Sequence, residues 1–379
     1  MPTPPDGVAY PELVIGLAGP IGVDTEALTD SVTSALKDVN YKAYTIRLTD
    51  EMLKVPLVED IEKLQKDFYR DVVYKIAYAN TLRKQAGDYS MLARLALIGI
   101  RQHRFDITGS HDKIPEQGVG YILRQLKRPE EVDLLRKIYG RQFILLSAYG
   151  SSEDRTKLLK RKLKTTLPTQ TSGHQISAYV GELIEKDANE EEERFGQRLR
   201  ETFHLGDVFV DGIQKANMDK GVLRFFHALF GRNDISPSKS EYGMYAAKSA
   251  SLRSSDLSRQ VGAAIFSNDG ELITQGTNEV PKAFGGTYWD LEEPDFRDVH
   301  IGYDPNEVSK HELLRDIFER LSDRGWLSTR ALEAGSIEAI VNAAVSKTSS
   351  SEYKSGPLAS ALVIPIAESS DLLVDGSPS

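Results

Sequence analysis

The chain has 379 residues, which is enough for two or three domains with ordinary hydrophobic cores. Lysine and arginine number 47 against 56 aspartates and glutamates, and the formal charge of −9 gives no global attraction to nucleic acid or an anionic membrane. The absence of cysteine excludes disulfides, a cysteine nucleophile and zinc sites with thiolate ligands. No apolar stretch reaches the ~20 residues of a membrane span. The proline-rich start is unlike a secretory signal, so we expect a cytoplasmic protein.

The first part of the chain predicts a parallel α/β unit. Glu12 to Ala18 is an apolar run typical of a buried strand, and the glycine-rich turn Gly19 to Gly22 follows it. Asp24 stands at the N-cap position of a helix predicted over Thr25 to Lys37. Tyr41 to Leu48 alternates and predicts a second strand. When a strand–turn–helix–strand unit of this kind binds phosphate, the phosphate lies at the turn that follows the first strand.

The turn is a weak match to a phosphate-binding loop. A Walker A loop reads G-x-x-x-x-G-K-[ST], because its lysine reaches the outer phosphates and its hydroxyl holds magnesium. Here Val23 and Asp24 follow Gly22, so the lysine is missing, which argues against a working kinase or ATPase. Two interpretations stay open, a degenerate nucleotide site or a tight turn capped by Asp24 without a ligand. For the first, the candidate nucleotide-binding residues are Gly16, Gly19, Gly22, Asp24 and Thr25.

Helices and strands continue to a polar linker. We expect helices over Glu59 to Gln85, Ser90 to Arg104, Pro129 to Tyr139 and Ala216 to Phe230, and strands over Tyr121 to Leu126, Gln142 to Ala148 and Asp207 to Asp211. The basic helix Asp154 to Lys164 fits either a lid over phosphates or a solvated face. Gly231 to Ser240 is polar, so the predicted domains are residues 1–231, nucleotide-binding or regulatory, and 241–379.

The second domain opens with a helix and a hairpin. Glu241 to Leu252 predicts a helix, and the strands Val261 to Phe266 and Glu271 to Thr277 flank the turn Asn268-Asp269-Gly270. Two further helices are predicted over Glu307 to Ser322 and Thr329 to Val345.

The hairpin carries a resemblance to a known family. The segments S-R-Q-V-G-A from Ser258 and G-T-N-E-V-P from Gly276 resemble the opening hairpin of cytidine and deoxycytidylate deaminases. Residues 11–310 as a whole resemble the bacterial anti-phage dCTP deaminases. In these, a P-loop-kinase-like domain precedes an α/β/α deaminase domain. The resemblance implies a zinc-dependent hydrolase that converts deoxycytidine to deoxyuridine nucleotides and depletes dCTP during phage infection. It also implies a deoxynucleotide substrate held by Asn278, through its sugar, with Arg259 and Glu279.

The sequence departs from this family at the metal site. The deaminases bind zinc through H-x-E and P-C-x-x-C motifs, and neither occurs here. The expected deaminase domain is therefore incomplete, and we expect this chain alone neither to bind zinc nor to deaminate. Three explanations stay open: a truncated or frameshifted copy with Ser369 to Ser379 as an unrelated tail, one half of a split enzyme, or a nucleotide-binding regulatory pseudoenzyme. The expected partners are a deoxynucleotide and either a second copy of the chain or a complementary deaminase half.

Overall fold

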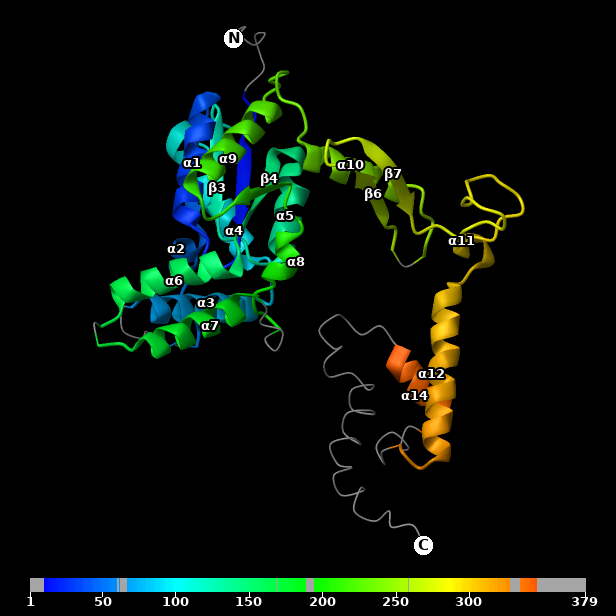
Figure 1. Cartoon of the computed structure of the whole chain (residues 1–379). Coiled ribbons are helices and arrows are strands. Elements are labelled where there is room, and N and C mark those ends of the chain that lie inside the picture. The colour runs from blue at the N-terminus through cyan, green and yellow to red at the C-terminus, as the bar shows by residue number, and fades with distance from the viewer. Residues whose placement is uncertain are drawn as a thin grey trace. The chain divides into compact units, whose positions relative to one another are not determined.

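The computed structural model describes residues 10–59, 61, 67–168, 170–188, 194–257, 259–327 and 335–345. The chain divides into two compact units, Met1–Ile235 and Ser236–Ser379, which we call the first and second unit (Figure 1). Within the described residues, no helix combines the length and the apolar character that crossing a bilayer requires.

A five-stranded sheet forms the centre of the first unit. Its order is β2-β3-β1-β4-β5, and every neighbouring pair is parallel. β1 lies in the middle and is buried along its whole length, as its continuous apolar sequence requires. The strands are β1 Leu13–Ala18, β2 Lys42–Arg47, β3 Val119–Arg124, β4 Phe143–Tyr149 and β5 Val208–Asp211. The parallel α/β fold predicted for this part of the chain is thereby confirmed.

Helices cover both faces of this sheet. α1 (Thr25–Asp38) and α9 (Lys215–Leu229) pack on the face to which Ile15 of β1 points. The next residue, Val14, points to the opposite face, which α2 (Leu48–Met52), α3 (Phe68–Ala86), α4 (Met91–Thr108) and α5 (Pro129–Tyr139) cover. The two-residue alternation of a strand thus divides the apolar residues between two cores.

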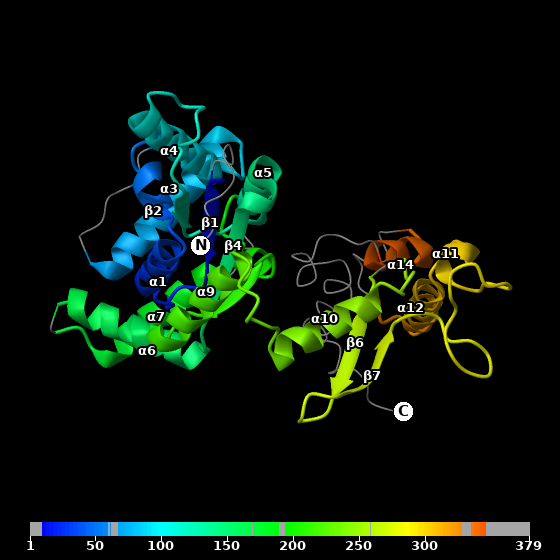
Figure 2. The same cartoon turned by 90° about the horizontal axis from the view of Figure 1, so that it is seen from above.

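Three further helices complete the first unit. α6 (Ser152–Thr166) and α7 (Gly173–Ala188) pack against each other and against α3, beyond the end of the sheet (Figure 1). Figure 2 shows α6 and α7 side by side from above. Their contact is made by a small apolar cluster that includes Leu159, Leu163, Ile176 and Val180. α8 (Leu199–Phe203) follows before β5.

The predicted helices agree with the observed ones, with differences at their ends. α4 continues four residues beyond Arg104, because Gly109, in a left-handed conformation, ends it. The helix predicted from Glu59 is described from Phe68, where the Asp67 side chain accepts a hydrogen bond from the Arg70 amide and starts α3. Residues 60 and 62–66 lie outside the described part of the chain.

The second unit begins with helix α10 (Lys239–Ser251) and the antiparallel pair β6 (Gly262–Phe266) and β7 (Leu272–Thr277). α10 packs on both strands, and Gly270 closes the predicted turn with a φ of +97°. α11 (Asp298–Ile301) follows, and α12 (Pro305–Asp323) packs on α14 (Ile337–Val345). The start of the helix predicted over Thr329 to Val345 and the tail Ser369 to Ser379 fall outside the described residues.

Leu145 of β4 provides a test of the sheet core. Its side chain is fully buried between the sheet and the covering helices, so Leu145→Ala leaves a cavity and should lower the free energy of unfolding by about 2–5 kcal/mol. Leu223→Ala on α9 is the matched control, because that leucine is more than one-third exposed and should cost less than about 1 kcal/mol. Urea denaturation measures both, and equal losses would contradict this packing.

Candidate functional site

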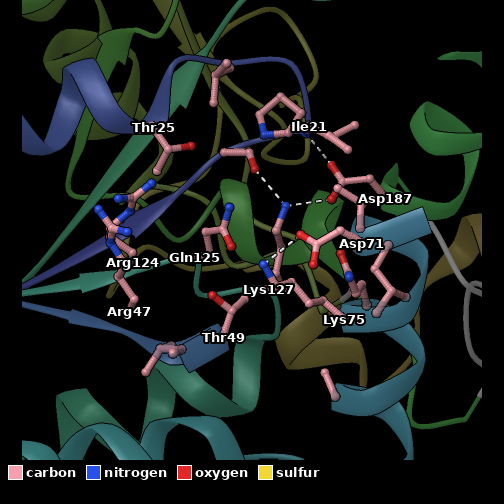
Figure 3. A pocket seen from close by; sticks show the side chains of 18 of the residues that line it. Ile21, Thr25, Arg47, Thr49, Asp71, Lys75, Arg124, Gln125, Lys127 and Asp187 are labelled. Carbon is pink, nitrogen blue, oxygen red and sulfur yellow. Dashed lines mark hydrogen bonds and ion pairs between the residues drawn. The ribbon is translucent and has the colours of Figure 1, made fainter. Parts of the chain in front are cut away.

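A cavity of about 330 Å³ lies at the carboxyl edge of the sheet in the first unit. The loops after β1 and β3, together with helix α2 after β2, form one side of it, and residues of α3, α6 and α7 form the other (Figure 3). In open α/β sheets, ligands bind outside the carboxyl ends of the strands. The cavity therefore has both the size and the place of a small-molecule site.

The turn between β1 and α1, Gly19 to Gly22, forms one wall of the cavity. Gly22 has a φ of +94°, and a Cβ there would lie 2.8 Å from the Cβ of Arg155, so only glycine fits between the turn and α6. Asp24 caps α1, because its carboxylate accepts a hydrogen bond from the Ala27 amide at 3.1 Å. Val23 is buried in the core between the sheet, α1 and α9.

Cationic side chains outnumber acidic ones around the cavity. Six cations and four acids line it, giving a formal charge of +2 in a chain whose total is −9. The cations are Arg47, Lys75, Arg83, Arg124, Lys127 and Lys162, and the acids are Glu26, Asp50, Asp71 and Asp187. Such a local excess attracts an anionic ligand that the protein as a whole would repel.

Two arginines stand side by side at the ends of β2 and β3. Arg47 and Arg124 are register partners in the sheet, and both bind the carboxylate of Glu26 on α1, at 3.0 Å and 2.7 Å respectively. The hydrogen bond from Arg124 lowers the pKa of Glu26. The carboxylate therefore stays ionised and keeps both guanidinium groups beside the cavity.

A lysine from another part of the chain reaches the turn. Lys127, in the loop between β3 and α5, donates hydrogen bonds through Nζ to the Gly19 carbonyl at 2.9 Å and to Asp187 Oδ1 at 2.6 Å. Asp187 Oδ2 in turn accepts a hydrogen bond from the Ile21 amide at 2.5 Å (Figure 3). The turn lacks a lysine of its own, and Lys127 supplies a positive charge there.

A buried ion pair supports the loop that carries Lys127. Arg83 of α3 donates to Glu131 of α5 at 2.9 Å, and both side chains are at most 1% exposed. The other carboxylate oxygen of Glu131 accepts hydrogen bonds from the main-chain amides of Lys127 and Arg128. Arg83 also lines the cavity, and its buried Nε has no hydrogen-bond partner among the described residues. In native proteins a water molecule, an ion or a ligand atom commonly satisfies such a buried donor.

Gln125 lines the cavity in a conformation that is uncommon for its residue type. Its φ is +71°, a left-handed value that costs roughly 1–2 kcal/mol for a residue other than glycine. The amides of Gln125 and Leu126 both donate to the Leu17 carbonyl, which fixes this bend at the end of β3. Strained positions of this kind cluster at ligand sites.

The candidate nucleotide-binding residues separate into two groups. Gly19, Gly22 and Thr25 line the cavity, whereas Asp24 caps α1 outside it. Gly16 also lies outside the cavity lining, within β1, where a Cβ would come within 2.6 Å of the Leu126 side chain. Its role is therefore close packing.

Sequence reasoning missed most of the cationic side chains of the site. Arg47 and Arg124 lie within two residues of the ends of the strands predicted over Tyr41 to Leu48 and Tyr121 to Leu126, and this place near the ligand-binding edge was a usable signal. Arg83 and Lys75 lie on α3. The spacing of its apolar residues predicts which face of the helix is buried, but it does not predict which cationic side chains reach the cavity. Of the six basic residues in the predicted lid helix, Lys162 lines the cavity and Arg155 contacts the turn at the Ile21 carbonyl.

The substrate residues expected in the second unit lie in one loop region. Asn278 accepts a hydrogen bond from the Val261 amide at 2.8 Å and donates to the Arg259 carbonyl at 2.7 Å. Glu279 is buried and accepts from both the amide and the hydroxyl of Ser255 at 2.8 Å. These side chains hold the loop together by binding to its own main chain and side chains.

The residues present do not fit the zinc site that the resemblance implies. The chain has no cysteine, and the described residues contain no group of three or more histidine, aspartate or glutamate side chains that could hold a metal ion. A deaminase zinc site needs one histidine and two cysteines. No step of a reaction can be derived through zinc on these residues.

No protein-family model matches the sequence, and no curated protein matches it. Among solved structures, a gluconokinase from Sinorhizobium meliloti 1021 is 11% identical, covering 59% of this chain and 95% of its own, with a TM-score of 0.30. A shikimate kinase from Bacteroides thetaiotaomicron is 11% identical, covering 57% of this chain and 98% of its own, with a TM-score of 0.32. At these identities and TM-scores, neither similarity indicates a function for this chain.

Glu131→Gln tests whether the buried ion pair supports the site. The substitution leaves the Arg83 charge buried without its partner, so it should lower the free energy of unfolding by about 3–5 kcal/mol. Glu153→Gln, in an exposed pair with Lys157, should change it by less than about 1 kcal/mol. Chemical denaturation compares the two variants. If the Glu131 variant is as stable as the Glu153 variant, the Arg83–Glu131 pair does not support the loop.

Proposed function

We propose that the first unit binds a phosphorylated small molecule, and that its ligand class is a nucleotide. The observation that carries the proposal is the cluster of six cationic side chains around a glycine turn at the start of α1. Helix N-termini and turn amides attract phosphate oxygens, and arginine and lysine neutralise their charge. The unused Arg83 Nε is independent support, since it offers a buried donor to the ligand.

The same unit is proposed to be P-loop-kinase-like in fold but not in activity. The parallel sheet and the glycine turn after its central strand support that relation. Val23 replaces the Walker lysine and is buried in the core, and Asp24 is used as a helix cap. A site without these two groups can hold phosphates but lacks the parts that drive phosphoryl transfer. Its role is then that of a sensor or regulatory site.

Two lysines on α6 test the binding proposal. Lys162 lines the cavity and has no ion-pair partner among the described residues, whereas Lys157 on the same helix faces away and pairs with Glu153. Lys162→Ala should weaken binding of a nucleoside triphosphate about tenfold, which corresponds to about 1.4 kcal/mol. Lys157→Ala should leave the affinity unchanged. Isothermal titration with ATP, GTP, dCTP and dTTP measures both.

The alternative outcomes of this titration are distinct. Binding that weakens equally in both lysine variants would indicate attraction to α6 as a whole rather than to the cavity. The absence of binding by the unmodified chain to all four nucleotides would contradict the proposal.

A second function is proposed for the second unit, as a deoxycytidine nucleotide deaminase component of anti-phage defence. The observation that favours it is the order of helix α10, hairpin β6–β7 and the Asn278–Glu279 loop, which is the order that the resemblance implies. Because the chain does not fit a zinc site, it would act as one half of a split deaminase or as a regulatory pseudoenzyme. Either role suits a partner polypeptide or a second copy of the chain.

Complementation tests this second function. The purified chain with zinc and dCTP or dCMP should form no deoxyuridine nucleotide, because the chain has no cysteine and its described residues hold no group that could bind the metal. Adding a polypeptide that carries H-x-E and P-C-x-x-C should produce uracil absorbance if the chain is half of an enzyme. If the added polypeptide restores no deamination, the regulatory role is the one that stands. Deamination by the chain alone would contradict both the split-enzyme role and the regulatory role.

A further inference from the structure

Asp187 holds the turn from the far side of the cavity. It lies in the last turn of α7, and its side chain is almost fully buried. One carboxylate oxygen accepts the Ile21 amide at 2.5 Å, and the other accepts Lys127 Nζ at 2.6 Å (Figure 3). Both bonds cross from one wall of the cavity to the other, and all three residues line it.

The two groups that Asp187 binds are those that a phosphate would bind at this turn. A main-chain amide of a glycine turn and a lysine ammonium are the usual donors to a phosphate oxygen. A carboxylate resembles part of a phosphate, because it presents two anionic oxygens on one central atom. The anion position of the turn is therefore already filled by a side chain of the protein.

The position of Asp187 on its own helix is unfavourable. The C-terminal end of a helix carries a partial negative charge, so an aspartate in the last turn of α7 is repelled by it. The bonds to Ile21 and Lys127 offset this repulsion. Asp187 is consequently held by the turn rather than by its helix.

We infer that Asp187 is a built-in competitor of the ligand, a carboxylate that occupies the phosphate position of the turn until a ligand phosphate displaces it. The inference rests on the proposed nucleotide binding and adds its regulation. The affinity measured for a phosphate ligand is then reduced by the fraction of molecules in which Asp187 occupies the turn. Displacement also frees the end of α7, so that helix reports the occupancy of the site.

Asp187→Asn tests the competition directly in the full chain. Asparagine keeps an acceptor for the Ile21 amide but loses the charge that binds Lys127, so a nucleoside triphosphate should bind about tenfold more tightly. Asp71→Asn is the matched control, since Asp71 also lines the cavity but pairs with Lys75 away from the turn. It removes the same charge and should raise the affinity less than threefold. Titration calorimetry with ATP or dCTP, together with inorganic triphosphate, gives the three affinities.

Hydrogen exchange supplies a second measurement that does not depend on a variant. Saturating nucleotide should increase amide exchange in the last turn of α7, residues 185–188, of the unmodified chain. Affinity that rises equally in both aspartate variants, or unchanged exchange on binding, would overturn the inference while leaving nucleotide binding intact. The absence of nucleotide binding by the unmodified chain would overturn both proposals.

Discussion

The geometry of the first unit's site depends on the hydrogen bonds and the ion pair that the Glu131 carboxylate makes. This carboxylate is fully buried and binds the Arg83 guanidinium and two consecutive main-chain amides of the loop after β3. A charge in that environment is tolerated only when every partner is present. The same contacts that satisfy Glu131 therefore fix α3, the start of α5 and the loop that carries Lys127 in one arrangement.

This arrangement explains how a turn without a lysine of its own still has one in contact with it, paired with Asp187. The cation comes from the β3–α5 loop and contacts the turn through the Gly19 carbonyl and Asp187. The two arginines at the ends of β2 and β3 extend the positive surface along the sheet edge, held by Glu26. The site is assembled from the carboxyl ends of three strands, so its charge does not depend on any single motif.

Local sequence patterns predicted the five strands of the first unit and six of its helices, but not α2, α7, α8 or the site. The buried runs that form β1, β3 and β4 are continuous in sequence, and the Asp24 cap follows from its place before an apolar periodic segment. The contacts of Asp187 with Ile21 and of Glu131 with Arg83 join residues 166 and 48 positions apart. No periodicity or spacing predicts such pairs, because they are decided by how the helices pack.

In the second unit, the structure brings together the substrate residues that the resemblance implied. Their observed contacts are with their own loop. Asn278 and Glu279 bind the main chain of their own loop, and the hairpin in front of them matches its predicted turn. Short motifs can identify a hairpin because turn chemistry is local. A zinc site depends on side chains from distant segments, and neither the sequence nor the described residues provide that set.

The burial of Val23 has a consequence for how this turn could change its chemistry. In a phosphate-binding loop, the residue at this place is a lysine that extends toward the ligand. Here the side chain packs between the sheet, α1 and α9, and a Cβ at Gly212 would lie 2.9 Å from it. Val23 also borders the cavity, so a lysine introduced at position 23 would have to leave this apolar packing to bring its charge to the cavity. Bringing a cation to this point of the turn would therefore cost the apolar packing that Val23 now provides.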